Sequence, residues 1–251
     1  MLPEVKAALL ELNHRFYESF GPAFATTRRR LQPGVRRVLD ALPAAGNWLD
    51  LGCGGGALAK EWLRRGFAGH YLGIDFSQSL LTEAQAAVAD MDPGGRVTLI
   101  QADLWNAGWI AQLPAQHFAG VFAFAVLHHI PGQEARRELL QQVNSLLAGG
   151  GVFIHSVWQF QHSPRLWARR LEWETVGLSA ADLDEGDTLL DWRFALPGQT
   201  EQTGLRYVHL FSREELAALA STTGFRIVGE FESDGEGGRL GLYQKWEKDQ
   251  T

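Results

Sequence analysis

Asn47-Trp-Leu-Asp-Leu-Gly-Cys-Gly-Gly-Gly-Ala57 is the stretch of this chain that decides its fold. A short apolar run carries Asp50 near its end and enters a turn in which four of five residues, 52–56, are glycine. A helix-forming run over residues 57–65 follows directly. Glycines at a strand-to-helix turn adopt backbone angles that side chains forbid, and they let the main chain touch a ligand. The stretch therefore predicts a ligand site at the edge of a parallel sheet.

The glycine turn alone does not identify the ligand. Gly52-x-Gly54-x-x-Ala57 also fits the relaxed dinucleotide fingerprint, in which alanine may take the third position. An acidic residue, Asp75, follows the turn at a distance that suits the ribose of either kind of cofactor. Features elsewhere in the chain must decide between them.

Composition indicates one folded domain that needs no metal. The chain has 251 residues, 45% of them hydrophobic, with nine tryptophans and a single cysteine, Cys53. That cysteine excludes an internal disulfide and a cysteine-built zinc site. No apolar stretch approaches the roughly 18 to 20 residues of a membrane span, and no secretory signal is visible. We expect a cytoplasmic protein without membrane contact.

The net charge of −6 disfavours a surface dedicated to nucleic acid. Arginines nevertheless gather within residues 28–37 and again within residues 165–170, whereas residues 172–201 are acidic. The arginines fit either solvated helix faces or a local anion-binding site.

Strands and helices alternate through the first two thirds of the chain. Helices are predicted over residues 5–20, 33–42, 57–65, 79–89 and 134–147, and strands over residues 48–51, 70–75, 97–103, 120–125 and 151–157. Alternation of this kind predicts a parallel, doubly wound sheet.

The pattern breaks after the fifth strand. Residues 159–205 show no clean strand period and are interpreted as a partly helical, substrate-side insertion. A capping box at Ser212-Arg-Glu-Glu215 then starts another helix, and residues 225–232 and 241–247 form two closing strands. The prediction is an α/β, Rossmann-like, mostly parallel seven-stranded sheet with a C-terminal antiparallel hairpin. It forms one domain over residues 1–251, with residues 1–45 as a helical lid.

Taken together, these motifs resemble class I S-adenosylmethionine-dependent methyltransferases along essentially the whole chain. The resemblance lies in Asp50-x-Gly52-x-Gly54-x-Gly56, in acids after the second and third strands, and in the segments 127–131 and 146–151. Ala148 departs from it, since the family usually has proline there. These features favour a methyltransferase over a dehydrogenase, with S-adenosylmethionine as cofactor and no metal. The resemblance implies that the cofactor is bordered by Tyr17, Arg28, Asp50, Gly52, Gly54, Gly56, Asp75, Phe76, Asp103, Leu104 and Ala125.

Three of these positions have specific expected contacts. Asp75 would accept hydrogen bonds from ribose hydroxyls, and Asp103 would meet the adenine amine. Arg28 would reach the methionine carboxylate of the cofactor from the lid.

A closer resemblance points to the tRNA wobble-uridine methyltransferases that esterify 5-carboxymethyluridine. It is carried by residues 16–28, 125–130 and 154–158, and above all by Arg206-Tyr-Val-His-Leu-Phe211. It implies a tRNA acceptor, a substrate-side place for Arg206 and His209, and a small zinc-binding activator protein as partner. A small carboxylic or phenolic metabolite is the alternative acceptor. The remote alternative is that the chain is a non-catalytic protein that binds the cofactor and acts through interactions.

The acceptor chemistry decides which side chains would act. A carboxylate has a pKa near 4 and is already a nucleophile at neutral pH, so it needs cationic groups rather than a base. Arg206 and His209 would hold it, beside His128. An amine or hydroxyl would need a base, for which His128, His129 or His209 could serve. The alternative is that both residues have structural roles, Arg206 in an ion pair with a nearby carboxylate and His209 as a buried, hydrogen-bonded ring.

Overall fold

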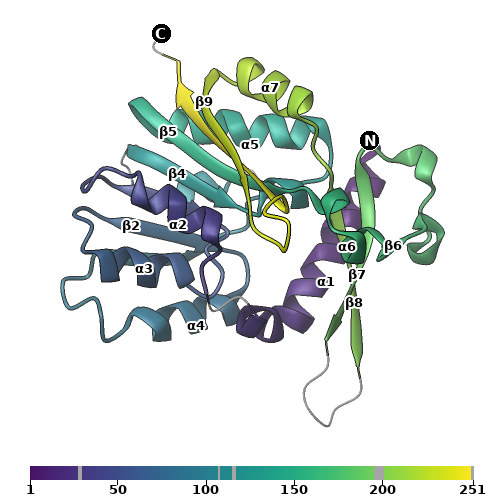
Figure 1. The fold of residues 1–251 in the computed structure, drawn as a ribbon, viewed down its shortest axis with the longest axis horizontal. Helices are drawn as coiled ribbons and strands as arrows, with labels where there is room; N and C mark the ends of the chain where they lie inside the picture. The colour runs from purple at the N-terminus through teal and green to yellow at the C-terminus, as the bar shows by residue number, and fades with distance from the viewer. Residues whose placement is uncertain (28–29, 107, 115–116, 195–200, 250–251) are drawn as a thin grey trace.

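A computed structural model describes residues 1–27, 30–106, 108–114, 117–194 and 201–249 of the chain, without side-chain positions for 22–27 and 194. Its large sheet has the strand order β3-β2-β1-β4-β5-β10-β9 (Figure 1). The strands β1 to β5 are parallel, whereas β10 is antiparallel to both β5 and β9. The bounds are Trp48–Leu51 (β1), Tyr71–Asp75 (β2), Val97–Gln101 (β3), Phe118–Phe124 (β4), Leu147–Trp158 (β5), Phe225–Ser233 (β9) and Gly241–Lys248 (β10). The predicted seven-stranded sheet with a closing hairpin is confirmed.

Helices cover both faces of this sheet, as its buried strands require. On one face α2 (Pro33–Asp40), α3 (Ala57–Arg65) and α4 (Gln78–Val88) share a core with Trp48 and Phe122. On the other face α5 (Gln133–Leu146) and α7 (Arg213–Thr222) pack over Leu49, Val121 and Phe153. Figure 1 shows these two helical layers on opposite sides of the strands. Short helical turns complete the connections at Trp109–Gln112 (η1) and Leu127–His129 (η2).

The segment after β5 is partly helical, as expected, and it also contains a second sheet that the sequence did not predict. Its strands β6 (Arg170–Leu171), β7 (Asp187–Phe194) and β8 (Gln202–His209) are antiparallel in the order β6-β7-β8. The turns η3 (Phe160–His162) and α6 (Pro164–Trp167) precede β6, and η4 (Trp173–Val176) and η5 (Ala180–Asp182) lie between β6 and β7.

The three-stranded sheet β6-β7-β8 is called the accessory sheet below. Burial on both of its faces explains why the sequence pattern did not predict it. Leu189 of β7 packs with the residues of the first helix, and the adjacent Leu190 packs with Phe160 and Val208. Because both faces are covered, neighbouring residues are apolar and the period of two is lost.

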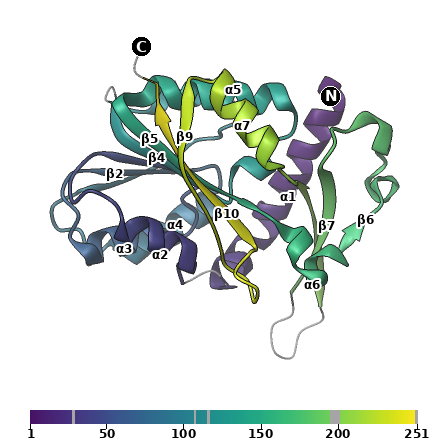
Figure 2. The same cartoon turned by 45° about the horizontal axis from the view of Figure 1, so that its top comes forward.

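The first helix, α1 (Pro3–Thr27), connects the two sheets. Its residues Val5 and Leu9 are buried against Leu189 and Tyr207 of the accessory sheet. Figures 1 and 2 both show α1 between the ends of the parallel strands and the accessory strands. The helix thereby stands beside the edge at which a Rossmann-like sheet binds its ligand.

Candidate functional site

A cavity of about 820 Å³ opens at the carboxyl ends of the parallel strands. Its walls come from the glycine turn after β1, the ends of β2, β3 and β4, and helix α1. The lining residues include Tyr17, Asp50, Gly52, Cys53, Gly54, Asp75, Phe76, Asp103, Leu104, Trp105, Ala125, Val126 and His129. Nine of the eleven residues predicted to border the cofactor are among them.

Glycine is suited to its positions in the turn for different physical reasons. Gly52 and Gly56 have φ angles of +68° and +76°, and a Cβ there would lie 2.7 Å from Val126 and 2.8 Å from Ala84. Gly54 has a φ of +54° and no atom within 4 Å of its Cβ position. Gly52 and Gly56 therefore permit close packing, whereas Gly54 leaves open space at the cavity. Gly56 is not part of the cavity wall that the structure describes.

Asp75 binds the glycine turn to the start of the next helix. One carboxylate oxygen accepts a hydrogen bond from the Gly54 amide at 2.9 Å, and the other accepts one from the Ser77 amide at 2.9 Å. Each carboxylate oxygen has a further lone pair, which a ligand hydroxyl can use. Burial raises the pKa of Asp75 to about 6, although these amide hydrogen bonds oppose the rise.

Asp50 is a second buried carboxylate in the wall. The Tyr71 hydroxyl donates a hydrogen bond to its Oδ2. Burial raises the pKa of Asp50 to about 7; the Tyr71 hydrogen bond opposes this rise, and the charge of Asp75 adds to it. Asp50 and Asp75, 25 residues apart in sequence, thus line the same buried part of the cavity. Two carboxylates there suit a ligand with hydroxyl or ammonium groups.

Asp103, Phe76 and Leu104 form the wall next to β3. Oδ1 of Asp103 accepts a hydrogen bond from the Trp105 amide at 3.0 Å, and Oδ2 lies 3.4 Å from Nε2 of His14. An acceptor beside apolar and aromatic surface suits a flat heterocycle that carries an amine.

Ala125 holds a strained backbone at the end of β4. Its φ is +58°, a left-handed conformation that costs a non-glycine residue about 1 to 3 kcal/mol. Its amide donates to the Ser156 hydroxyl at 3.1 Å and to the Ser156 carbonyl at 3.1 Å, which fixes this turn. The strain lies in the cavity wall, where a ligand would touch it.

The structure brings His129 to the cavity and turns His128 behind it. The two rings stay in edge contact, with centroids 4.4 Å apart, but only His129 is part of the described cavity wall. Nδ1 of His128 accepts a hydrogen bond from the Trp158 amide at 3.3 Å, and the ring is fully buried. Nδ1 of His129 lies 3.1 Å from the Tyr207 carbonyl, and its Nε2 lies 2.9 Å from the Tyr17 hydroxyl.

The tautomer of His129 follows from these partners. A carbonyl can only accept, so Nδ1 carries the proton and, in the neutral ring, Nε2 accepts from Tyr17. His128 is the residue expected beside the acceptor, with His129 as a possible base, whereas the structure places only His129 in the described cavity wall.

Arg206 lies in β8 with 3% of its surface exposed. Its guanidinium carbon is 4.5 Å from the ring centroid of Trp158 and 5.3 Å from that of Phe16. Such distances are those of cation–π contacts. Trp158 stacks near His128, and Phe16 packs against the cavity residue Tyr17. Arg206 thus stands one layer behind the cavity wall.

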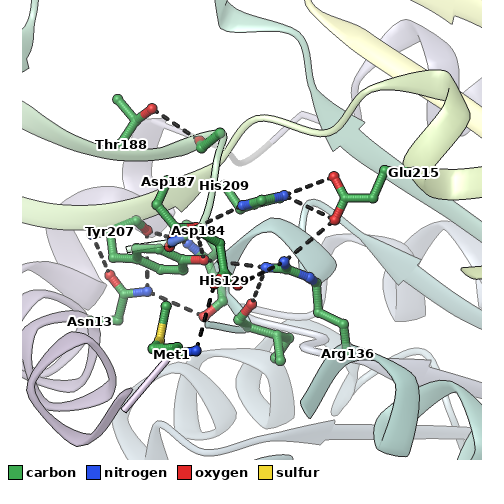
Figure 3. Close-up of polar contacts among 12 residues, drawn as sticks. Met1, Asn13, His129, Arg136, Asp184, Asp187, Thr188, Tyr207, His209 and Glu215 are labelled. Atoms are coloured by element: carbon green, nitrogen blue, oxygen red, sulfur yellow. Dashed lines mark hydrogen bonds and ion pairs between the residues drawn. The ribbon is translucent and has the colours of Figure 1, made fainter. Parts of the chain in front are cut away.

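His209 lies in a buried ion cluster and not in the cavity wall (Figure 3). Its Nδ1 is 2.7 Å from Asp187, and its Nε2 is 2.9 Å from Glu215. Arg136 joins the cluster, 3.4 Å from Glu215 and 3.5 Å from Asp184. Because both ring nitrogens meet carboxylate oxygens, the ring is an imidazolium. This environment matches the reading of His209 as a buried, hydrogen-bonded ring.

Arg28 lies outside the described residues, so its expected contact with the cofactor stays a prediction. Within the described ranges, no group of three or more His, Cys, Asp or Glu side chains is arranged so that it could hold a metal ion. No described helix is long and apolar enough to cross a membrane.

Comparisons with known proteins agree with this geometry. Residues 24–230 match a family described as "Methyltransferase domain". A protein of Encephalitozoon cuniculi, named as a methyltransferase, is 30% identical over 86% of this chain and 87% of its own length. The tRNA (carboxymethyluridine(34)-5-O)-methyltransferase of Schizosaccharomyces pombe is 23% identical over 87% of this chain and 90% of its own length.

Among solved structures, the chain is similar in fold to the 1,6-didemethyltoxoflavin-N1-methyltransferase of Burkholderia thailandensis. The TM-score is 0.63 at 19% identity, and the match covers 100% of this chain and 92% of the other. That crystal structure contains S-adenosylhomocysteine and the toxoflavin precursor.

Proposed function

The chain belongs to the methyltransferase family, and from this premise we propose that it methylates a carboxylate or another oxygen acceptor, with the 5-carboxymethyl group of a tRNA wobble uridine as first candidate. The family match confirms the enzyme class predicted from the glycine turn together with the motifs that follow it. The expected cofactor, S-adenosylmethionine, is in keeping with it, because the related fold of 1,6-didemethyltoxoflavin-N1-methyltransferase holds S-adenosylhomocysteine.

The cavity has the groups that S-adenosylmethionine requires. Its volume lies within the range of ligand pockets, roughly 300 to 1,000 Å³. Gly54 leaves open space beside Asp50 and Asp75, whose carboxylates suit hydroxyl and ammonium groups. Phe76, Leu104 and Asp103 offer an apolar wall with one acceptor for the adenine. The cofactor supplies a sulfonium methyl group, whose carbon–sulfur bond breaks as the acceptor oxygen bonds the carbon.

Arg206 is the observation that carries the carboxylate proposal. A guanidinium buried against Trp158 and Phe16 keeps its charge, and it lies directly behind the wall formed by Tyr17 and His129. A carboxylate acceptor needs no proton removed, so a fixed cation serves it better than a base. The hydrogen bonds of His129 to Tyr17 and Tyr207 support a positioning role for that ring rather than proton transfer.

We expect Arg206→Ala to lower kcat/KM for the acceptor by roughly 10- to 100-fold, since the fixed positive charge behind the wall is lost. Arg206→Lys should recover little, because an ammonium does not reproduce the planar guanidinium. The affinity for S-adenosylhomocysteine, measured by calorimetry, should change less than the kinetic constant. Arg226→Ala, at an exposed site on β9, is the matched control. Full turnover by Arg206→Ala would contradict the assignment.

The choice of tRNA over a small molecule rests on relatives named tRNA (carboxymethyluridine(34)-5-O)-methyltransferase. The decisive assay offers the enzyme an anticodon stem-loop with 5-carboxymethyluridine and, separately, the free nucleoside. Formation of the methyl ester in the stem-loop alone supports tRNA. Mass spectrometry of wobble nucleosides from a strain without the gene tests the same point in the cell. Unchanged ester content there would favour a metabolite.

The net charge of −6 keeps the small-molecule alternative open, because a basic field is the usual feature of an RNA-binding surface. The Burkholderia protein of similar fold is crystallised with a small heterocycle. The resemblance also predicts a small zinc-binding activator, so the assays are to be run with and without such a protein. Cofactor binding without turnover on any acceptor would leave the non-catalytic alternative.

A further inference from the structure

Helix α1 contacts the cavity wall through several side chains, and one of them, His14, was not among the predicted site residues. The imidazole of His14 stacks on Phe76 with ring centroids 4.6 Å apart and planes inclined by 9°. It also lies 4.8 Å from the ring of Trp105. Its Nε2 is 3.4 Å from Oδ2 of Asp103. Phe76, Trp105 and Asp103 all line the cavity.

We propose that His14 is a positioning residue of the adenine subsite, which makes the enzyme selective for a purine with an exocyclic 6-amino group. The inference rests on the proposed cofactor and is independent of the acceptor. His14 touches both the aromatic wall and the acid that would read the amine. It therefore joins the two parts of the subsite through one side chain on a different element.

The carboxylate of Asp103 is held from two sides. Its Oδ1 accepts a hydrogen bond from the Trp105 amide at 3.0 Å, and its Oδ2 lies 3.4 Å from Nε2 of His14. A carboxylate fixed in this way keeps lone pairs for a further donor. Because its orientation is set before the ligand arrives, less conformational freedom is lost on binding.

Selectivity depends on whether the purine group opposite Asp103 donates or accepts a hydrogen bond. A 6-amino group donates a hydrogen bond to the carboxylate, whereas a 6-oxo group presents a second acceptor and leaves the carboxylate without a donor. The probes are therefore S-adenosylhomocysteine and S-inosylhomocysteine, which differ at this position. The readout is the ratio of their dissociation constants, measured by calorimetry.

Two substitutions separate the contacts of His14. His14→Phe keeps an aromatic ring over Phe76 and removes the nitrogen that contacts Asp103, whereas His14→Gln keeps a polar group and removes the ring. We expect His14→Phe to lower the ratio roughly fivefold to tenfold, through the loss of one polar contact with Asp103. His14→Gln should preserve most of the ratio while both ligands bind more weakly. His14→Leu, which removes both contacts, replaces His14→Phe should the latter not fold.

Controls distinguish this role from general loosening of α1. Val5→Ala loosens α1 at its contact with the accessory sheet, away from the cavity wall, and should leave the ratio unchanged. His70→Phe tests an exposed histidine in the β1–β2 region. An unchanged ratio in His14→Phe, or an equal loss in Val5→Ala, overturns the inference. If the wild type binds neither ligand, the cofactor assignment fails and the inference with it. If both ligands bind and no acceptor is methylated, only the proposed acceptor fails.

Discussion

At the scale of single residues, the site contains carboxylates that in most proteins are exposed to water. Asp50 and Asp75 are buried side by side, and burial raises their pKa values to about 7 and about 6. Burial disfavours the ionised form of both carboxylates, but it places their oxygens in the wall of the ligand cavity. Such a site trades stability for binding.

We therefore predict that Asp50→Asn makes the cofactor-free protein more stable at pH 8. The folded-state pKa of Asp50 is raised, so its stabilising contribution is present below about pH 4 and is lost as the pH rises through about 7. Asparagine stays neutral and accepts the Tyr71 hydrogen bond, so the gain should be about 2 to 4 kcal/mol at pH 8 and small at pH 4.

Urea unfolding at both pH values measures the effect of Asp50→Asn, and Asp90→Asn, at an exposed site, is the control. The affinity for S-adenosylhomocysteine should fall in Asp50→Asn alone. An equal change in stability at the two pH values would show that the buried charge is not costly.

At the scale of elements, the accessory sheet is attached to the main domain through charge as well as apolar packing. His209 at the end of β8 faces Asp187 of β7 and Glu215 of α7, while Arg136 of α5 contacts Glu215 and Asp184 (Figure 3). The network therefore joins β7, β8 and α7, which follow one another in the chain, to the more distant helix α5. A cluster of alternating charges keeps each buried ion paired.

The network predicts that stability falls at alkaline pH. Burial alone would lower the pKa of His209, but its hydrogen bonds to Asp187 and Glu215 outweigh burial and raise the pKa above its ordinary value. The stabilisation by His209 is therefore complete below about pH 6.5 and is lost as the pH rises through the raised pKa.

The test is His209→Gln, which should lower stability by about 3 to 5 kcal/mol at pH 6, because it leaves buried carboxylates without their cation. The loss should shrink as the pH rises, and thermal unfolding from pH 6 to 10 follows it. His70→Gln is the exposed control. A loss that does not depend on pH would mean that His209 acts through packing alone.

At the scale of the whole molecule, helix α1 couples the accessory sheet to the cofactor cavity. It is buried against β8 and β7 through Val5 and Leu9, and it reaches the cavity wall through His14 and Tyr17 (Figure 2). A ligand in the cavity should therefore stabilise a helix whose main packing partner is a different sheet.

Hydrogen exchange tests this coupling. Because S-adenosylhomocysteine binds the folded state, a concentration of 100 times its dissociation constant should stabilise the protein by about 2.7 kcal/mol. Exchange of amides in residues 10–20 of α1 should slow more than exchange in the β9–β10 hairpin, which lies at the far edge of the sheet. Equal protection in both segments would refute the coupling through α1.

The sequence by itself determined the parallel sheet and most of the cavity wall. The turn at residues 52–56 lies between a strand and a helix that the structure places at the predicted bounds, Trp48–Leu51 and Ala57–Arg65. Local chemistry is sufficient here, because the carboxyl ends of parallel strands meet at one edge whatever else the chain does. Asp75 and Asp103 therefore come to the same cavity as Gly54.

Only the tertiary structure decided the accessory sheet and the places of the histidines. β7 lacks a period of two because α1 and the residues around Phe160 cover its opposite faces. His128 is the residue expected beside the acceptor, whereas the structure places only His129 in the described cavity wall. His209 is drawn to Asp187 and Glu215, one of them 22 residues before it in the chain. These outcomes depend on contacts between distant elements, which no local pattern in the sequence encodes.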